Sequence, residues 1–152
     1  MSWQRFVWER VKEAKNIIVF CDLNFRSKLW CAEKVQKTMP KIMRFVDVCI
    51  ANEEDAEKAL GIKARNTGIS SGLLDKEEYQ RIVEKICNTY GCKYVAVSLR
   101  KSFSANHNCW SGMFYEKRKR TIIFLNEYDI QVIDKLRAGD SFATVVIFGL
   151  LK

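Results

Sequence analysis

The sequence predicts an α/β domain with a mainly parallel sheet, and three observations support this prediction. Three short, continuous apolar runs have the character of strands that are buried on both faces. Segments with apolar residues at helical spacing alternate with these runs, which is the order of a layered α/β fold. Polar residues directly follow each run, and ligands of parallel sheets bind beyond the carboxyl ends of the strands.

The first half of the chain alternates helix and strand. Pro40 must break or kink the second helix, because it lacks the N–H that a helix interior requires. Asn52 opens a short helix, and Gly61 stops it. The predicted elements are a helix over 3–15, a strand over 16–21, a helix over 28–44, a strand over 45–51 and the short helix over 52–60.

The second half begins like the first and then changes character. A polar loop leads to a helix that Asp75 caps and Gly91 stops, and a third buried strand follows it. Two strand-like runs then flank the basic segment 117–120, which favours a solvated hairpin turn. The predicted elements are a loop over 62–74, a helix over 75–90, strands over 94–97, 110–115, 121–125 and 128–133, and a helix from 140 to 151.

Composition limits the function. A chain of 152 residues with 48% hydrophobic and 29% charged residues suits one globular domain. The net charge of +8 suggests an anionic partner, which nucleic acid, a nucleotide or an acidic metabolite could each be. The basic run lacks the aromatic interleaving of a nucleic-acid site, so no nucleic-acid partner is expected. No apolar run approaches the roughly 20 residues that cross a membrane, so no membrane partner is expected.

The six cysteines do not suggest a metal centre. No CxxC pair is present and His107 is the only histidine, so a zinc site is not expected. Cys21 and Cys49 lie in apolar runs and are expected to be small core residues. Reduced thiols predict a cytoplasmic location.

The last stretch carries the strongest chemical signal. Asp140 and Ser141 are good N-cap residues, and the helix start that they predict suits an anion such as phosphate. Gly139 lets the backbone approach that anion, and Asp140 could take a proton from a hydroxyl. The alternative is that Asp140 is only a cap. The helix that follows is apolar nearly all round, which predicts self-association.

Polar residues after the strands complete a candidate site. Each also has an ordinary explanation: a turn for Asn24, a helix cap for Asn52, and solvated surface charge for the arginines. Three such strand ends together with a helix mouth favour a site. The groups are Asp22, Asn24 and Arg26, then Asn52 and Asp55, then Ser98 and Arg100, with Asp140 at the helix mouth.

Four segments in order resemble the PfkB (ribokinase-like) family of sugar kinases, and most closely its 2-keto-3-deoxygluconate kinase branch. The resemblance implies a ribokinase-like three-layer α/β/α fold with a mainly parallel sheet. It also implies that residues 1–152 form a single partial domain, without the family's amino-terminal lid half and its carboxyl-terminal helices. The segments are 22–30 (DLNFRSKLW), 51–56 (ANEEDA), 97–111 (VSLR through WS) and 138–142 (AGDSF).

The resemblance also implies roles for the candidate residues. Asp140 matches the catalytic base, and the N–H groups of Ala138, Gly139 and Asp140 match the anion hole for the transferring phosphoryl group. Further implied positions are Asn24 and Arg26 for the ATP phosphates and the sugar acid, Ser98 and Arg100 for the nucleotide, and Asn52 and Asp55 for Mg²⁺ and phosphate through water, with no certain direct protein ligand of the metal.

The implied activity is ATP- and Mg²⁺-dependent phosphorylation of 2-keto-3-deoxygluconate or a similar sugar. It is expected to be weak or absent in this chain alone, with a second copy or a complementing chain as partner. Arg137, Thr144 and Val145 replace small residues of the family pattern. The alternative from another class is therefore an inactive remnant that acts as a binding or dimerising module. A small basic nucleic-acid-binding protein is the third alternative.

Overall fold

The computed structural model describes residues 16–63, 76–104, 106–131 and 138–152. The helix predicted over 3–15, most of the loop over 62–74, the proposed cap Asp75 and the substituted position Arg137 lie outside these residues. The elements are β1 (Phe20–Asp22), α2 (Ala32–Met43), β2 (Val48–Asn52), α3 (Glu53–Leu60), α4 (Lys76–Tyr90), β3 (Tyr94–Ser102), β4 (His107–Glu116), β5 (Thr121–Phe124), β6 (Tyr128–Gln131) and α5 (Ala138–Leu151).

The described strands form one six-stranded sheet in the order β1-β2-β3-β4-β5, with β6 also paired to β4. β1, β2 and β3 are parallel to one another. β4 is antiparallel to β3, β5 and β6. The expected parallel half and the hairpin around the basic turn are therefore both confirmed.

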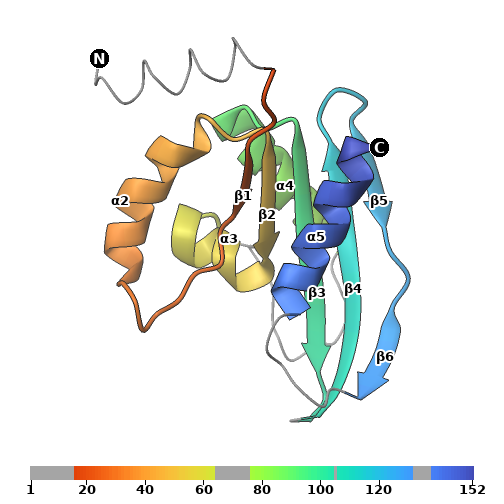
Figure 1. Cartoon of the computed structure of the whole chain (residues 1–152). Helices are drawn as coiled ribbons and strands as arrows, with labels where there is room; N and C mark the ends of the chain where they lie inside the picture. The colour runs from red at the N-terminus through yellow and green to blue at the C-terminus, as the bar shows by residue number, and fades with distance from the viewer. Residues whose placement is uncertain (1–15, 64–75, 105, 132–137) are drawn as a thin grey trace.

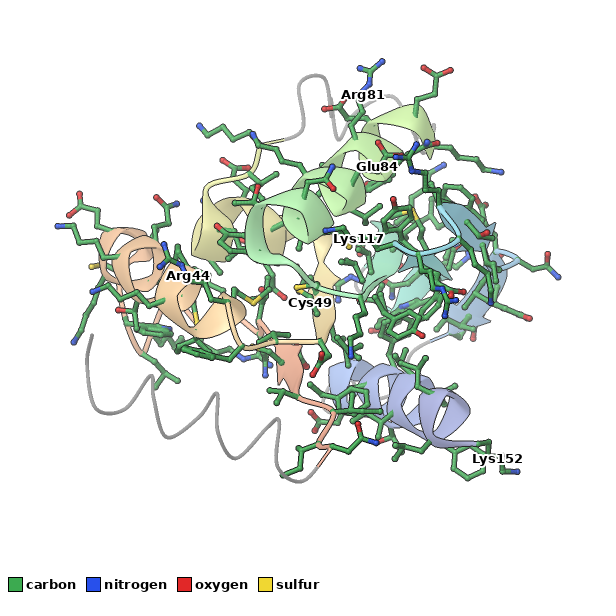
Figure 2. All side chains as sticks on the ribbon, turned by 90° about the horizontal axis from the view of Figure 1, so that it is seen from above. Arg44, Cys49, Arg81, Glu84, Lys117 and Lys152 are labelled. Carbon is green, nitrogen blue, oxygen red and sulfur yellow. The ribbon has the colours of Figure 1, made fainter. Side chains whose placement is uncertain are left out.

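Helices cover both faces of the sheet, so the expected three-layer α/β/α arrangement is confirmed. Of the described helices, α2, α3 and α4 lie on one side of the sheet and α5 lies on the other (Figures 1 and 2). The side chains of β2 alternate between these layers: Cys49 and Ala51 join the larger core, whereas Val48 and Ile50 join the core beneath α5. Because β2 is buried on both faces, its sequence is a continuous apolar run.

Helix ends follow the local sequence closely. Gly61 and Gly91 both have a left-handed φ, at 67° and 83°, and stop α3 and α4 as predicted. Pro40 lies inside α2, so the helix is not broken there, and the alternative of a kink stays a prediction. Pro40 stands only three residues before the end of the helix, and its missing N–H therefore affects little more than the last turn.

β3 is much longer than predicted. It runs to Ser102, so Ser98 and Arg100 lie within the strand and do not follow it. Each of its nine residues is paired with a residue of β4, from Tyr94 opposite Glu116 to Ser102 opposite Asn108. This long antiparallel partner supplies the backbone hydrogen bonds that let a polar sequence remain extended.

α5 begins at Ala138, two residues earlier than expected. The prediction that Asp140 is the N-cap is therefore wrong, because Asp140 already stands in the first helical turn. The inner face of α5 packs on the sheet through Phe142, Val146, Ile147 and Leu150. Its outer face exposes Val145, Phe148 and Leu151, which are 70%, 59% and 64% accessible. None of the described helices is long and apolar enough to span a membrane.

All six cysteines are free thiols. Cys49 is fully buried in the larger core, as predicted, and lies between the sheet and the helices (Figure 2). Cys21 is half-buried against the same core. Burial raises the pKa of the Cys87 thiol to about 12 and that of Cys92 to about 11, so neither is a reactive nucleophile at neutral pH.

Gly112 of β4 makes room for α5. A Cβ at this position would stand 3.1 Å from Phe142 Cε2 and 3.1 Å from Leu125 Cδ1. We expect Gly112→Ala to lower the free energy of unfolding by about 1 kcal/mol, because the ring of Phe142 must shift from its seat. Urea denaturation measures the change.

Gly149→Ala is the matched control, because a Cβ there meets nothing within 4 Å and alanine favours helix. This control should be neutral or stabilising. Equal stability gains in both variants would show that α5 does not depend on the space above Gly112.

Candidate functional site

The carboxyl ends of β1 and β2 and the start of α5 lie near one another, beside the middle of β3 (Figure 1). Asp22 closes β1 opposite Ile50, and Asn52 closes β2 opposite Ser98. Phe142 of α5 lies above Gly112, which is itself paired with Ser98. The first turn of α5 therefore stands near the end of β2 and the middle of β3.

Asp55 fastens the loop after β1 to the start of α3. Its Oδ1 accepts a hydrogen bond from the Phe25 N–H at 2.8 Å, and its Oδ2 accepts one from the Asn52 N–H at 3.2 Å. The Asn52 Oδ1 accepts the Asp55 N–H at 2.8 Å, which completes a capping box. Asn52 is thus a helix cap, and Asp55 is a buried structural anchor that is only 4% exposed.

The loop that Asp55 holds contains Asn24 and leads to Arg26. Leu23 continues the pairing of β1 by donating its N–H to the Ile50 carbonyl at 2.9 Å. Asn24 has a left-handed φ of 34°, a conformation that asparagine tolerates better than most residues. Its N–H donates to the carboxylate of Asp22. Asn24 therefore forms the turn that directs Arg26 back toward the strand ends.

Three carboxylates share this part of the sheet. The pKa of Asp22 is raised, first by partial desolvation and next by the charge of Asp55, with a smaller contribution from Asp140. The pKa of Asp55 is raised by its burial, which outweighs the two N–H groups that it accepts. The positive charge of Arg26 acts on both Asp22 and Asp55 and favours their ionised forms. The site therefore combines concentrated negative charge with one nearby guanidinium.

Asp140 is exposed, as is Asp22, whereas Asp55 is buried. Asp140 stands in the first turn of α5, where backbone N–H groups have no partner within the helix. A Cβ at Gly139 would meet nothing within 4 Å, so a ligand can approach this stretch of backbone. The arrangement can place a proton acceptor, the Asp140 carboxylate, beside donors for an anion.

The structure brings most of the predicted residues together. Asn24, Arg26, Asn52, Asp55 and Asp140 are linked by the contacts and charges just described, and Ser98 lies beside Asn52. Arg100 is different, because it lies one step farther out along β3, exposed and opposite Trp110. Among the described residues, no three His, Cys, Asp or Glu side chains are grouped as ligands for a metal ion.

Sequence reasoning gave Asp22 no role of its own, although its carboxylate lies between Asp55 and Asp140. The available signal was its place as the last residue of an apolar run. Val145 is the opposite case, a residue to which sequence reasoning assigned more weight than the structure does. It replaces a small residue of the family pattern, but its side chain is 70% exposed on the outer face of the helix.

Solved structures with the same fold cover nearly the whole chain. A 2-dehydro-3-deoxygluconokinase from Thermotoga maritima is 43% identical with a TM-score of 0.82, over 93% of this chain and 40% of that one. A PfkB family carbohydrate kinase from Listeria grayi is 23% identical with a TM-score of 0.75, over 98% of this chain and 43% of that one. The chain thus spans about two fifths of the length of these kinases. No protein-family model and no curated protein sequence matches it.

The crowding of carboxylates should cost stability at neutral pH. Because the folded-state pKa of Asp22 is raised above its ordinary value of 3.8, the folded state binds more protons than the unfolded state, and stability falls as the pH rises through this window. We expect Asp22→Asn to stabilise the fold at pH 7 by a fraction of a kcal/mol, since Asp22 is exposed and screened. The gain should vanish at about pH 3, where the native carboxyl is already protonated.

Urea denaturation of both proteins at the two pH values measures this difference. Asp129→Asn is the control, because Asp129 is exposed and contacts His107 at 2.6 Å, so its removal should bring no gain. A loss of stability in Asp22→Asn at pH 7 would contradict the repulsion argument.

Proposed function

The chain belongs to the PfkB family of carbohydrate kinases, and from this premise we propose that it carries the phosphoryl-transfer centre of an ATP-dependent sugar-acid kinase. One observation supports the proposal above the others. Asp140, at the start of α5, lies near Asp22 and Asp55, in a chain that is 43% identical to a 2-dehydro-3-deoxygluconokinase.

In the proposed reaction a hydroxyl of the sugar acid lies against Asp140. The carboxylate accepts the hydroxyl proton as the oxygen attacks the γ-phosphorus of ATP. The N–H groups of Ala138, Gly139 and Asp140 point out of the first turn of the helix, where its dipole is positive. They stabilise the negative charge of the transferring group.

Mg²⁺ would neutralise part of the phosphate charge, and the residues at the strand ends suit contact through water. Both oxygens of Asp55 already accept backbone N–H groups, and the Oδ1 of Asn52 accepts the N–H of Asp55. These contacts favour indirect ligation, because Mg²⁺ keeps several of its waters when it binds a nucleotide. Asp22, Asn52 and Asp55 are the residues of this chain that would face that water shell.

Arg26 supports a sugar acid as the phosphoryl acceptor. Its guanidinium lies close enough to influence both Asp22 and Asp55, and a guanidinium binds a carboxylate through two parallel hydrogen bonds. The relative from Thermotoga maritima acts on 2-dehydro-3-deoxygluconate, as its name states. We therefore propose 2-keto-3-deoxygluconate, the same compound, or a similar sugar acid as the substrate. We also propose a cytoplasmic location, in keeping with six free thiols.

The second candidate function is that of an inactive module that binds or dimerises. The exposed apolar face of α5, formed by Val145, Phe148 and Leu151, is the observation that favours it. On this proposal a second copy or a complementing chain covers that face. The two candidates differ in whether the chain binds nucleotide and transfers phosphate.

The first test is phosphorylation of 2-keto-3-deoxygluconate by the whole chain with Mg²⁺ and ATP. We expect Asp140→Asn to lower the transfer rate by about 10²- to 10⁴-fold, because the base is lost, while the Kd for nucleotide changes little. Calorimetry gives the Kd, and a coupled assay for ADP gives the rate.

Asp129→Asn is the matched control and should keep the parental rate, since Asp129 is paired with Cys109 and, like Cys109, lies on the face of the sheet opposite α5. Nucleotide binding without any transfer, in both the parent and Asp140→Asn, would favour the binding module. A transfer rate that survives in Asp140→Asn would remove Asp140 from the proposed mechanism.

A further inference from the structure

Two buried polar groups on β4 have no hydrogen-bond partner among the residues that the structure describes. Asn108 is 1% exposed, and its Oδ1 accepts the Ser102 hydroxyl at 2.7 Å while its Nδ2 has no partner among the described residues. Turning the amide over would only exchange the unpaired atom. The indole Nε1 of Trp110 is likewise buried and unpaired within the described part of the chain. Such groups cost stability, so each requires an explanation.

The two groups lie on the same face of the sheet, because they stand two residues apart on one strand. Asn108 is opposite Ser102, and Trp110 is opposite Arg100. One pair farther along, Gly112 is opposite Ser98. The face therefore carries a row of polar side chains that begins at the proposed nucleotide position Ser98 and continues outward through Arg100.

α5 runs along this face and points its first turn toward the row. Its later residues pack near Phe20, Val48 and Tyr94, which stand at the amino ends of the parallel strands. Phe142, near its start, packs above Gly112. The helix is therefore antiparallel to β3 (Figure 1). The first turns of α5, where the helix dipole is positive, lie above the pair Ser98–Gly112, and Arg100–Trp110 is the next pair on this face.

We propose that Trp110 and Asn108, together with Arg100, bind the polyphosphate chain of the nucleotide. This inference rests on the proposed kinase function and extends its nucleotide site from β3 to β4. The indole N–H can only donate, and a guanidinium only donates, so the row suits a ligand rich in acceptors and negative charge. A polyphosphate supplies both and removes the cost of the unpaired groups.

The position of the row favours the nucleotide over the sugar acid. Arg26 has the guanidinium that suits the carboxylate of the sugar acid. Its charge acts to lower the pKa of Asp22, which ends β1, and of Asp55, which follows β2. Trp110 lies on β4, across β3 from those residues. The two substrates would then approach Asp140 from opposite sides, as transfer of a phosphoryl group between them requires.

Trp110→Phe tests the inference, because it removes the indole N–H and keeps an aromatic ring. We expect the Kd for a non-hydrolysable ATP analogue with Mg²⁺ to rise about 10-fold, since a hydrogen bond to a charged acceptor is lost. Trp30→Phe is the matched control. Trp30 is a partly buried tryptophan that packs on the larger core, on the opposite side of the sheet, and its replacement should leave the Kd within about twofold.

The indole ¹⁵N–¹H signal of Trp110 in the parent gives a readout that a purely structural role would not move. The chain has four tryptophans, and the spectrum of Trp110→Phe assigns the signal. We expect it to shift with the ATP analogue and with tripolyphosphate, but not with adenosine. The shift is measured on the parent protein, so a variant is needed only to assign the signal. Trp110→Tyr serves for the assignment if Trp110→Phe does not fold.

The outcomes separate this inference from the proposed function. If the parent binds the analogue while the signal stays fixed and Trp110→Phe binds equally well, the inference fails and the kinase proposal stands. A signal that responds to 2-keto-3-deoxygluconate alone also overturns it. If the folded parent binds neither the nucleotide analogue nor tripolyphosphate, the kinase proposal and the inference fall together.

Discussion

The buried carboxylate of Asp55 is the constraint on which the site depends. β1 has only three residues, and the loop after it would have little to hold it without the hydrogen bond from the Phe25 N–H to Asp55. The same carboxylate completes the cap of α3 by accepting the Asn52 N–H. Each hydrogen bond to a charged group contributes about 1.5–3 kcal/mol, which is ample to order a short loop. Through this residue the end of β1 and the end of β2 become one rigid unit.

Holding the carboxylates of this site close together has an electrostatic cost, and such a cost is consistent with a site for phosphoryl transfer. Burial raises the pKa of Asp55, and desolvation together with neighbouring charge raises that of Asp22, so the fold holds negative charge where it is unfavourable. Concentrated carboxylates of this kind are stabilised by cations, and a nucleotide brings Mg²⁺ with it. Among the described residues, the donors on β4 that have no hydrogen-bond partner are the opposite case, because an anion would satisfy them. On the proposed function, a complex of metal and polyphosphate would complement both kinds of group.

The elements that were predicted correctly are those whose causes are local. Gly61 and Gly91 end their helices because glycine alone takes the left-handed φ without cost, and Asn52 caps α3 through atoms three residues away. The wrong boundaries have distant causes. β3 extends to Ser102 only because β4 pairs with it throughout. Such partners are invisible in the sequence of the element itself.

By itself the sequence determined which residues could do the chemistry. The apolar runs, the caps and the four family-like segments indicated Asn24, Arg26, Asn52, Asp55 and Asp140 without reference to any contact. Only the tertiary structure decided how these residues meet. The charge of Asp22 acts on Asp55 and Asp140 because parallel register aligns the ends of β1 and β2 beneath the start of α5. The unpaired groups on β4 likewise arise from pairing with β3, since burial is a property of the packed sheet and of no residue alone.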